Sequence, residues 1–203
     1  MMKAKWLCLL LLIIGVLVVY VPNLSESFAG LDLDAYHKVI YGTNFSSLAK
    51  QLLIDVKGKI VPGYYGPLPS ISLLADKFLI GAQVPHVQFT LAVNVLIHCL
   101  NGILVFLLIR AIGAGLALAY VTSFLFLMHP IQVPSVLWVA QRKSLLMALF
   151  YLSAFLTYLK FRRDGSAVMY AFSLVLFAAG LLCKPTMVVL PAALLATIIL
   201  IPG

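Results

Sequence analysis

The chain has 203 residues, of which 64% are hydrophobic and only 10% are charged, and its formal net charge is +8. A soluble domain has about 45–50% apolar and about 25% charged residues, so a water-soluble fold is excluded. The basic residues are scattered singly between apolar stretches, without the stripe or aromatic interleaving of a nucleic-acid-binding surface, and no nucleic-acid partner is expected.

Six apolar stretches recur along the chain, and most approach the length needed to cross about 30 Å of hydrocarbon. Because backbone groups in lipid must be satisfied internally, each should be a helix. The sequence therefore predicts an all-α, polytopic transmembrane bundle of about six helices in one membrane domain, 1–203. The third stretch has about 13 clearly apolar residues and needs flanking residues to span. The predicted spans are 6–21, 89–109, 116–128, 145–159, 169–182 and 188–201.

The first span follows Lys3 and Lys5 and has two interpretations, a cleaved secretory signal or a retained anchor. A loose small-x-small cleavage pattern occurs at 27–29. The apolar run is slightly too long for a signal, and the cleavage pattern lies well beyond its end. A retained anchor is the better interpretation.

The short loops set the predicted orientation. If the spans alternate, one side of the membrane receives Lys3, Lys5, Arg110, Lys160, Arg162 and Arg163. That side should be cytoplasmic by the positive-inside rule, which places both termini in the cytoplasm. The other side then holds a long loop, 22–88, and two short turns, around 130–143 and 183–186.

The long outer loop carries five of the six acidic residues. Ser46 and Ser47 can cap a short helix with leucines on one face, typical of a helix lying in the membrane interface. A second short helix is expected over 70–79, after the irregular backbone of the Pro/Gly-rich segment 62–69.

Asp32 and Asp34 lie about ten residues beyond the first span, within reach of the outer membrane face. In extended backbone both carboxylates project to one side, where they could face an acceptor hydroxyl or a divalent cation. A carboxylate near a low-dielectric surface is also a candidate general base. The same spacing fits two solvated loop aspartates, so both interpretations stay open.

Four basic side chains are expected on this outer side: His129, Arg142, Lys143 and Lys184. Cations at the edge of hydrocarbon suit a lipid-linked phosphate. The alternative is that Arg142 and Lys143 only snorkel to the interface. Lys184 has apolar neighbours on both sides and is costly unless solvated or paired. Asn94 and His98, four residues apart on the second span, are expected to make interhelical hydrogen bonds.

The segment 127–146, with its His129-Pro130 and Gln141-Arg142-Lys143 motifs, is followed by Lys184-Pro185 and Leu190-Pro191. This order resembles the membrane part of bacterial glycosyltransferase-like proteins that carry tetratricopeptide repeats. Those proteins are related to the eukaryotic transmembrane O-mannosyltransferases, and both are similar to the GT-C class. The segments 66–72 and 94–101 agree with this placement.

The resemblance implies a GT-C-like fold in a bacterial inner membrane. It also implies a glycosyltransferase that moves a sugar from a polyprenyl-phosphate carrier to an acceptor on the outer face. Asp32 or Asp34 would be the loop acid, and His129, Arg142, Lys143 and Lys184 would hold the donor phosphate.

Two departures from the family accompany this resemblance. Leu33 separates an acidic pair that is adjacent in the family, and the further helices and repeats are absent after Gly203, so a truncated or accessory form is expected. The alternative function is a non-catalytic membrane subunit or lipid-carrier-binding scaffold of a larger complex. A transporter is disfavoured, because no span has a broken interior or paired intramembrane charges.

Overall fold

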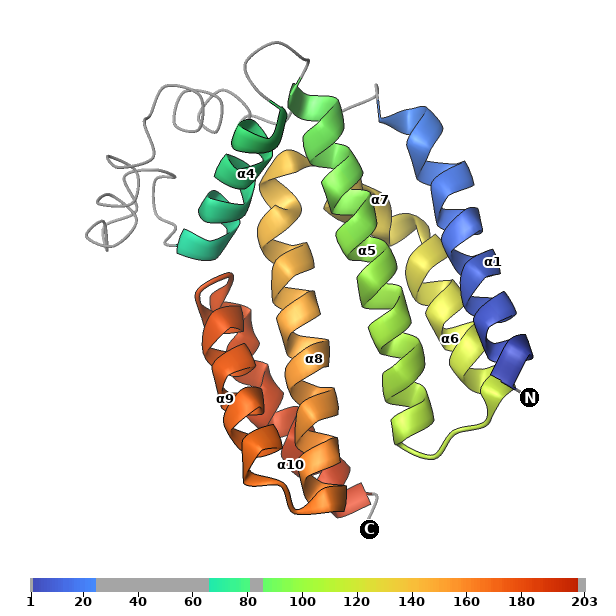
Figure 1. Ribbon diagram of the computed structural model, residues 1–203, viewed down its shortest axis with the longest axis vertical. Helices are drawn as coiled ribbons and strands as arrows, with labels where there is room; N and C mark the ends of the chain where they lie inside the picture. Colours follow the sequence, from blue (N-terminus) through green and yellow to red (C-terminus); the bar gives the residue numbers. More distant parts are fainter. Residues whose placement is uncertain (1, 25–65, 81–85, 201–203) are drawn as a thin grey trace.

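The computed structural model describes residues 2–24, 66–80 and 86–200, and every regular element in these ranges is a helix (Figure 1). The all-α class is therefore confirmed for the described part of the chain. Asp32, Asp34 and the interfacial helix expected after Ser46 lie outside it. The α-helices are α1 Met2–Tyr20, α4 Pro67–Ile80, α5 His86–Ala111, α6 Leu116–Met128, α7 Val133–Leu137, α8 Arg142–Asp164, α9 Ala167–Leu181 and α10 Leu190–Leu200. Short 3₁₀ turns are η1 Val21–Asn23, η2 Pro130–Gln132, η3 Val139–Gln141 and η4 Pro185–Val189.

Each predicted span falls on a helix, but the helices differ in length. Two helical stretches of the described part, Val87–Ala111 and Val139–Asp164, are long and apolar enough to cross a membrane. A third candidate is α6 with Pro130–Leu137, if this pair, bent by 49°, forms one span. Leu10–Asn23, Ala167–Leu181 and Pro185–Ile199 are apolar but shorter. The structure thus supports an integral membrane protein with two or three candidate spans, and six spans stay a prediction.

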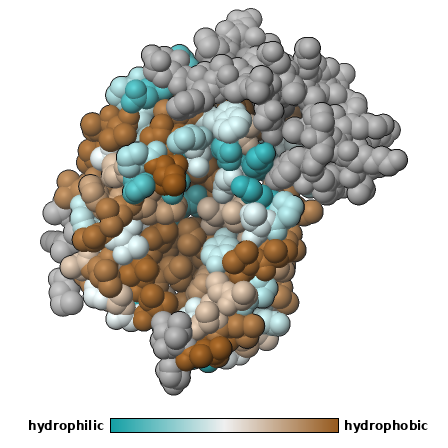
Figure 2. Space-filling view, turned by 180° about the vertical axis from the view of Figure 1, so that it is seen from behind, coloured by the Kyte–Doolittle hydropathy of each residue, from teal (hydrophilic) through white to brown (hydrophobic). Residues whose placement is uncertain are grey.

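The outer surface of the bundle is apolar, as a lipid-facing surface must be. Large hydrophobic side chains are exposed along both shorter and longer helices, including Leu107 on α5, Leu118 on α6, Val168 on α9 and Leu195 on α10. Figure 2 shows apolar surface over much of the bundle, with the hydrophilic residues on this face mostly in its upper half. Extensive exposed apolar surface of this kind marks a membrane-contacting protein.

Helix α5 runs through the centre of the bundle and packs against α6 on one side and α8 on the other (Figure 1). Gly102 permits the approach to α6, because a Cβ atom there would lie only 2.5 Å from the Leu127 side chain. Ser123 on α6 donates to the Gly102 carbonyl at 2.7 Å. Small residues and interhelical hydrogen bonds are the usual means of packing helices in lipid.

The interhelical role predicted for Asn94 and His98 is confirmed. Asn94 Nδ2 donates to the Val136 carbonyl at 3.0 Å, and His98 Nε2 lies 3.1 Å from the Leu127 carbonyl oxygen. Both side chains are fully buried. His98 joins α5 to α6, and Asn94 joins α5 to the segment that links α6 to α8.

The bundle has two distinct ends. The first, here called the basic end, comprises residues 110–116 and 160–167, and Figure 1 places the start of α1 and the end of α10 near it. Its turns close at Gly113 and Gly165, whose φ angles of 93° and 68° favour glycine. The opposite end, here called the α4 end, comprises residues 66–80, 129–145 and 182–187. The predicted gathering of Arg110, Lys160, Arg162 and Arg163 at one end is observed, whereas the compartment it faces stays a prediction.

Candidate functional site

A buried polar network holds α4 against α5 and α8 at the α4 end of the bundle. Its centre is Arg142, the first residue of α8, whose side chain is 0% exposed. Its Nη2 atom lies 2.8 Å from Asp76 Oδ2 on α4 and 2.8 Å from the Thr90 carbonyl oxygen on α5. Nη1 donates to Ser72 Oγ at 2.8 Å, and Nε donates to Asn94 Oδ1. All three guanidinium nitrogens are therefore engaged within the chain.

Asp76 is the carboxylate partner in this network, and it is almost as deeply buried as the guanidinium. Burial raises the pKa of Asp76, and this effect outweighs the opposing influence of the charge and hydrogen bond of Arg142 and of a hydrogen bond with Thr90. A buried ion pair of this kind adds little net stability, but removal of one partner leaves an uncompensated charge. The pair therefore fixes the position of α4.

The irregular segment between α6 and α8 places Arg142 at this point. Pro130 and Pro134 start short turns, and the backbone is extended at Trp138, so the chain does not continue as one helix. Asn94 ties this segment to α5 through the carbonyls of Val136 and Trp138. Asn94 thus orients Arg142 and also holds the segment that precedes Arg142 in the chain.

Lys184 approaches the same turn of α8 from the connection between α9 and η4. Its Nζ atom donates to Ser144 Oγ at 3.0 Å, and Ser144 Oγ donates to Gln141 Oε1 at 2.7 Å. Lys184 is partly buried, and this pairing agrees with the expectation that a lysine among apolar neighbours needs a partner. Lys143, also partly buried, belongs to the same first turn of α8.

The first turn of α8 therefore has an unusual charge pattern. It holds Arg142 and Lys143, receives Lys184 from the α9–η4 connection, and contains no acidic residue. Cations at a helix N-terminus oppose the helix dipole, whereas an anion there is favoured by the dipole. This arrangement suits a phosphate near Lys184.

His129 occupies a separate position at the start of η2. Its exposed side chain accepts a hydrogen bond at Nδ1 from the Ile131 N–H, at 3.2 Å, and so caps this turn. Of the four basic residues predicted to hold a phosphate, the structure brings Arg142, Lys143 and Lys184 to one turn. A contact of any of them with phosphate stays a prediction.

Sequence reasoning missed three participants: Asp76, Ser72 and Ser144. Ser72 and Asp76 are four residues apart and share one face of α4, which was the available signal. The proposed acid and possible cation site at Asp32 and Asp34 cannot be compared with this geometry, because those residues lie outside the described ranges.

No family model matches the chain, and no solved structure matches it. Among curated proteins, the Protein O-mannosyl-transferase TMTC1 of Mus musculus is 33% identical over 104 residues, and the Homo sapiens TMTC1 is 33% identical over 95 residues. The Protein O-mannosyl-transferase Tmtc2 of Drosophila melanogaster is 34% identical over 130 residues. The chain is thus distantly and partially similar to these O-mannosyl-transferases.

The similarity covers 51%, 46% and 61% of this chain in the mouse, human and fly comparisons. The chain spans only 11%, 10% and 14% of the lengths of those O-mannosyl-transferases. The predicted relation to the eukaryotic enzymes is therefore confirmed as a distant, partial similarity. The closer relation to bacterial repeat-bearing proteins stays a prediction.

Proposed function

We propose that this chain binds a sugar linked to polyprenyl phosphate at the α4 end, and that it acts as a GT-C-like glycosyltransferase at the outer face of its membrane. The observation that carries the proposal is the cationic first turn of α8, with Lys184 tied to Ser144 at 3.0 Å. The similarity to O-mannosyl-transferases supports a glycosyltransferase-related protein.

The balance of charge supports an anionic ligand. The acidic residues within the described ranges are Asp76 and Asp164, and Asp164 lies at the basic end. Asp76 forms its ion pair with Arg142. The described residues of the α4 end thus carry a positive surplus, which a phosphate would neutralise at the N-terminus of α8.

Each part of the donor has a matching chemical environment near Lys184. The lysine supplies a point charge for the phosphate, and the positive end of the α8 dipole adds a favourable potential at the same place. Leu182, Val188 and Val189 are exposed on either side of Lys184 along the chain and would contact the isoprenoid chain. Arg142 is a positioning residue in this proposal, because it anchors α4.

The proposed reaction is a single displacement at the sugar. Asp32 or Asp34 removes the proton of the acceptor hydroxyl, whose oxygen bonds to the anomeric carbon while the bond from that carbon to the phosphate oxygen breaks. The phosphate leaves with the electron pair of this bond. Lys184 stabilises the charge that develops on the phosphate.

The two aspartates provide the test of the enzymatic proposal. The double variant Asp32→Asn with Asp34→Asn should lower sugar transfer by at least about 100-fold, because a general base contributes roughly 10²–10⁴-fold. Transfer from a polyprenyl-phosphate sugar is measured in proteoliposomes that contain the full chain. Asp164→Asn, an exposed change at the opposite end, is the matched control. Full transfer by the double variant would end the assignment of these residues.

The second candidate function is a non-catalytic subunit that binds the lipid carrier within a larger complex. One observation favours it: every guanidinium nitrogen of Arg142 is engaged by the chain itself, which is a structural use of a residue expected to bind the donor. In that case the wild-type chain binds polyprenyl phosphate without transferring sugar, and the double aspartate variant binds equally well.

A further inference from the structure

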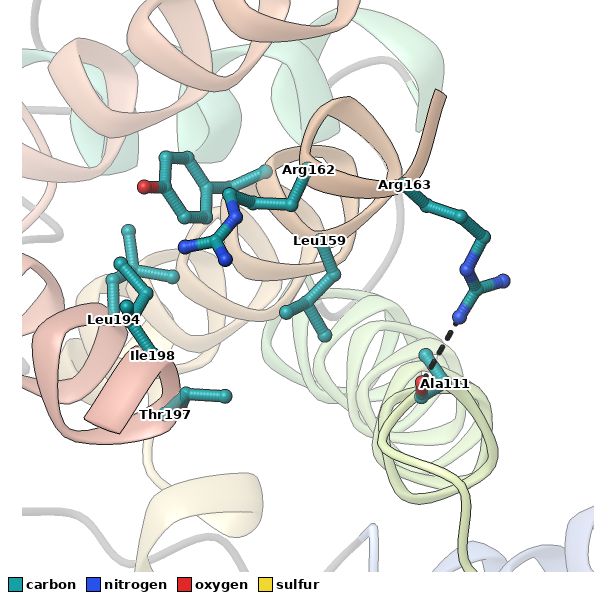
Figure 3. Close-up of a pocket in the computed structure, with 8 residues that line it drawn as sticks. Ala111, Leu159, Arg162, Arg163, Leu194, Thr197 and Ile198 are labelled. Atoms are coloured by element: carbon teal, nitrogen blue, oxygen red, sulfur yellow. Dashed lines mark hydrogen bonds between the residues drawn. The ribbon is translucent and has the colours of Figure 1, made fainter. Parts of the chain in front are cut away.

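A cavity of about 370 Å³ lies at the basic end, far along α8 from the proposed donor site (Figure 3). The last turns of α8 and α10 form its walls, next to the end of α5 at Ala111. Its principal lining residues are Tyr158, Leu159, Arg162, Leu194, Thr197 and Ile198. The volume falls within the range of about 300–1,000 Å³ that is typical of small-molecule sites.

Two adjacent arginines have different roles at this cavity. Arg163 turns away toward α5 and donates to the Ala111 carbonyl at 3.1 Å, at the C-terminus of that helix (Figure 3). Arg162 extends its guanidinium toward Leu194 and Ile198 of α10 (Figure 3). The guanidinium of Arg162 therefore faces a space whose other walls are largely apolar.

The lining divides by chemistry into two parts. Arg162, Tyr158 and Thr197 supply polar groups, and Thr197 Oγ1 donates to the Ala193 carbonyl at 2.8 Å. Leu159, Leu194 and Ile198 supply apolar surface. A ligand that fits both parts has an anionic head and a hydrocarbon tail.

The charge of the basic end complements such a ligand. Arg110, Lys160, Arg162 and Arg163 gather there, and Asp164, the acidic residue of this end within the described part, does not line the cavity. Basic pockets between transmembrane helices are typical sites for anionic phospholipid headgroups.

We infer that this cavity binds a phospholipid with an anionic headgroup. Arg162 holds the phosphate through its guanidinium fork, and Leu159, Leu194 and Ile198 contact the first part of an acyl chain. A soluble phosphate would leave this apolar wall without a partner, and a zwitterionic lipid would add a second cation beside Arg162. The lipid joins the ends of α8 and α10 from within the adjoining leaflet.

The test compares phosphatidylglycerol with phosphatidylcholine on the purified full chain in detergent, with bound lipid counted by native mass spectrometry. The wild-type chain should retain phosphatidylglycerol in preference to phosphatidylcholine. Arg162→Gln should weaken retention of phosphatidylglycerol roughly tenfold, as expected for loss of hydrogen bonds to a charged group. The control Lys160→Gln makes the same charge change at an exposed position outside the cavity lining and should leave retention unchanged.

Three results would overturn the inference. Equal losses in Arg162→Gln and Lys160→Gln would indicate diffuse attraction to the whole basic end. Equal retention of the two lipids by the wild-type chain would exclude selectivity for an anionic head. Displacement of phosphatidylglycerol by glycerol phosphate at equal concentration would identify a soluble anion as the ligand. Arg162 is exposed at its helix end, so its replacement should leave the fold intact, as checked by thermal unfolding.

Discussion

Arg142→Gln is expected to lower the free energy of unfolding by about 3–5 kcal/mol, because it leaves Asp76 buried without its partner charge. The variant also loses the hydrogen bonds from the Arg142 guanidinium to Ser72 and to the Thr90 carbonyl. In the wild-type chain these bonds join α4 and α5 to α8. Unfolding is measured by denaturant titration of the purified chain in micelles. We expect α4 to separate first, so that a cysteine placed at Leu74, a position buried in the wild-type chain, becomes more reactive in the variant.

A double replacement separates the ion pair from the packing around it. Changing Arg142 and Asp76 together to leucine removes both buried charges, and the double variant should be more stable than either single leucine variant. Lys160→Gln, an exposed change on the same helix, should alter stability by less than about 0.5 kcal/mol. If the double variant instead loses as much free energy of unfolding as the two single variants together, the account of Arg142 as an anchor for α4 is contradicted.

Lys184→Gln is expected to weaken binding of polyprenyl phosphate roughly tenfold to hundredfold, because it removes a charged donor placed at the N-terminus of α8. Its effect on unfolding should be small, since the Lys184 ammonium group donates to a neutral hydroxyl, that of Ser144, and not to a buried carboxylate. Binding is measured by titration of the lipid into the purified chain. The expected pattern is thus the reverse of that for Arg142→Gln.

Ser144→Ala is the matched control for Lys184. It removes the hydroxyl that contacts the ammonium group and keeps the positive charge, so lipid binding should weaken less than in Lys184→Gln. If Lys184→Gln destabilises the fold as strongly as Arg142→Gln and leaves lipid affinity unchanged, Lys184 is a packing residue and the proposed donor site is wrong.

The sequence predicted the helices well, because apolar stretches between charged turns restrict the possible structures. The range 116–128 agrees with α6 at both ends, and Asn94 and His98 make the expected interhelical contacts. The number of membrane crossings was less predictable, since α9 and α10 are apolar but shorter than a typical span.

The use of Arg142 could not be read from its neighbours along the chain. Its partners Ser72, Asp76 and Thr90 are 70, 66 and 52 residues away and meet it only when α4, α5 and α8 pack together. Local sequence suggested a snorkelling or phosphate-binding arginine, because both place a cation at the end of a span. Lys184 was more predictable, since its apolar neighbours required it to find a partner.

The most direct test of the central claim is photolabelling of the wild-type chain with a polyprenyl-phosphate analogue that carries the reactive group beside the phosphate. Peptides from 142–146 and 182–187 should be labelled, and excess polyprenyl phosphate should suppress this labelling whereas phosphate-free polyprenol should not. Lys184→Gln should remove most of the label. Labelling confined to the basic end near Arg162, or suppressed equally by polyprenol, would contradict a phosphate site at the start of α8.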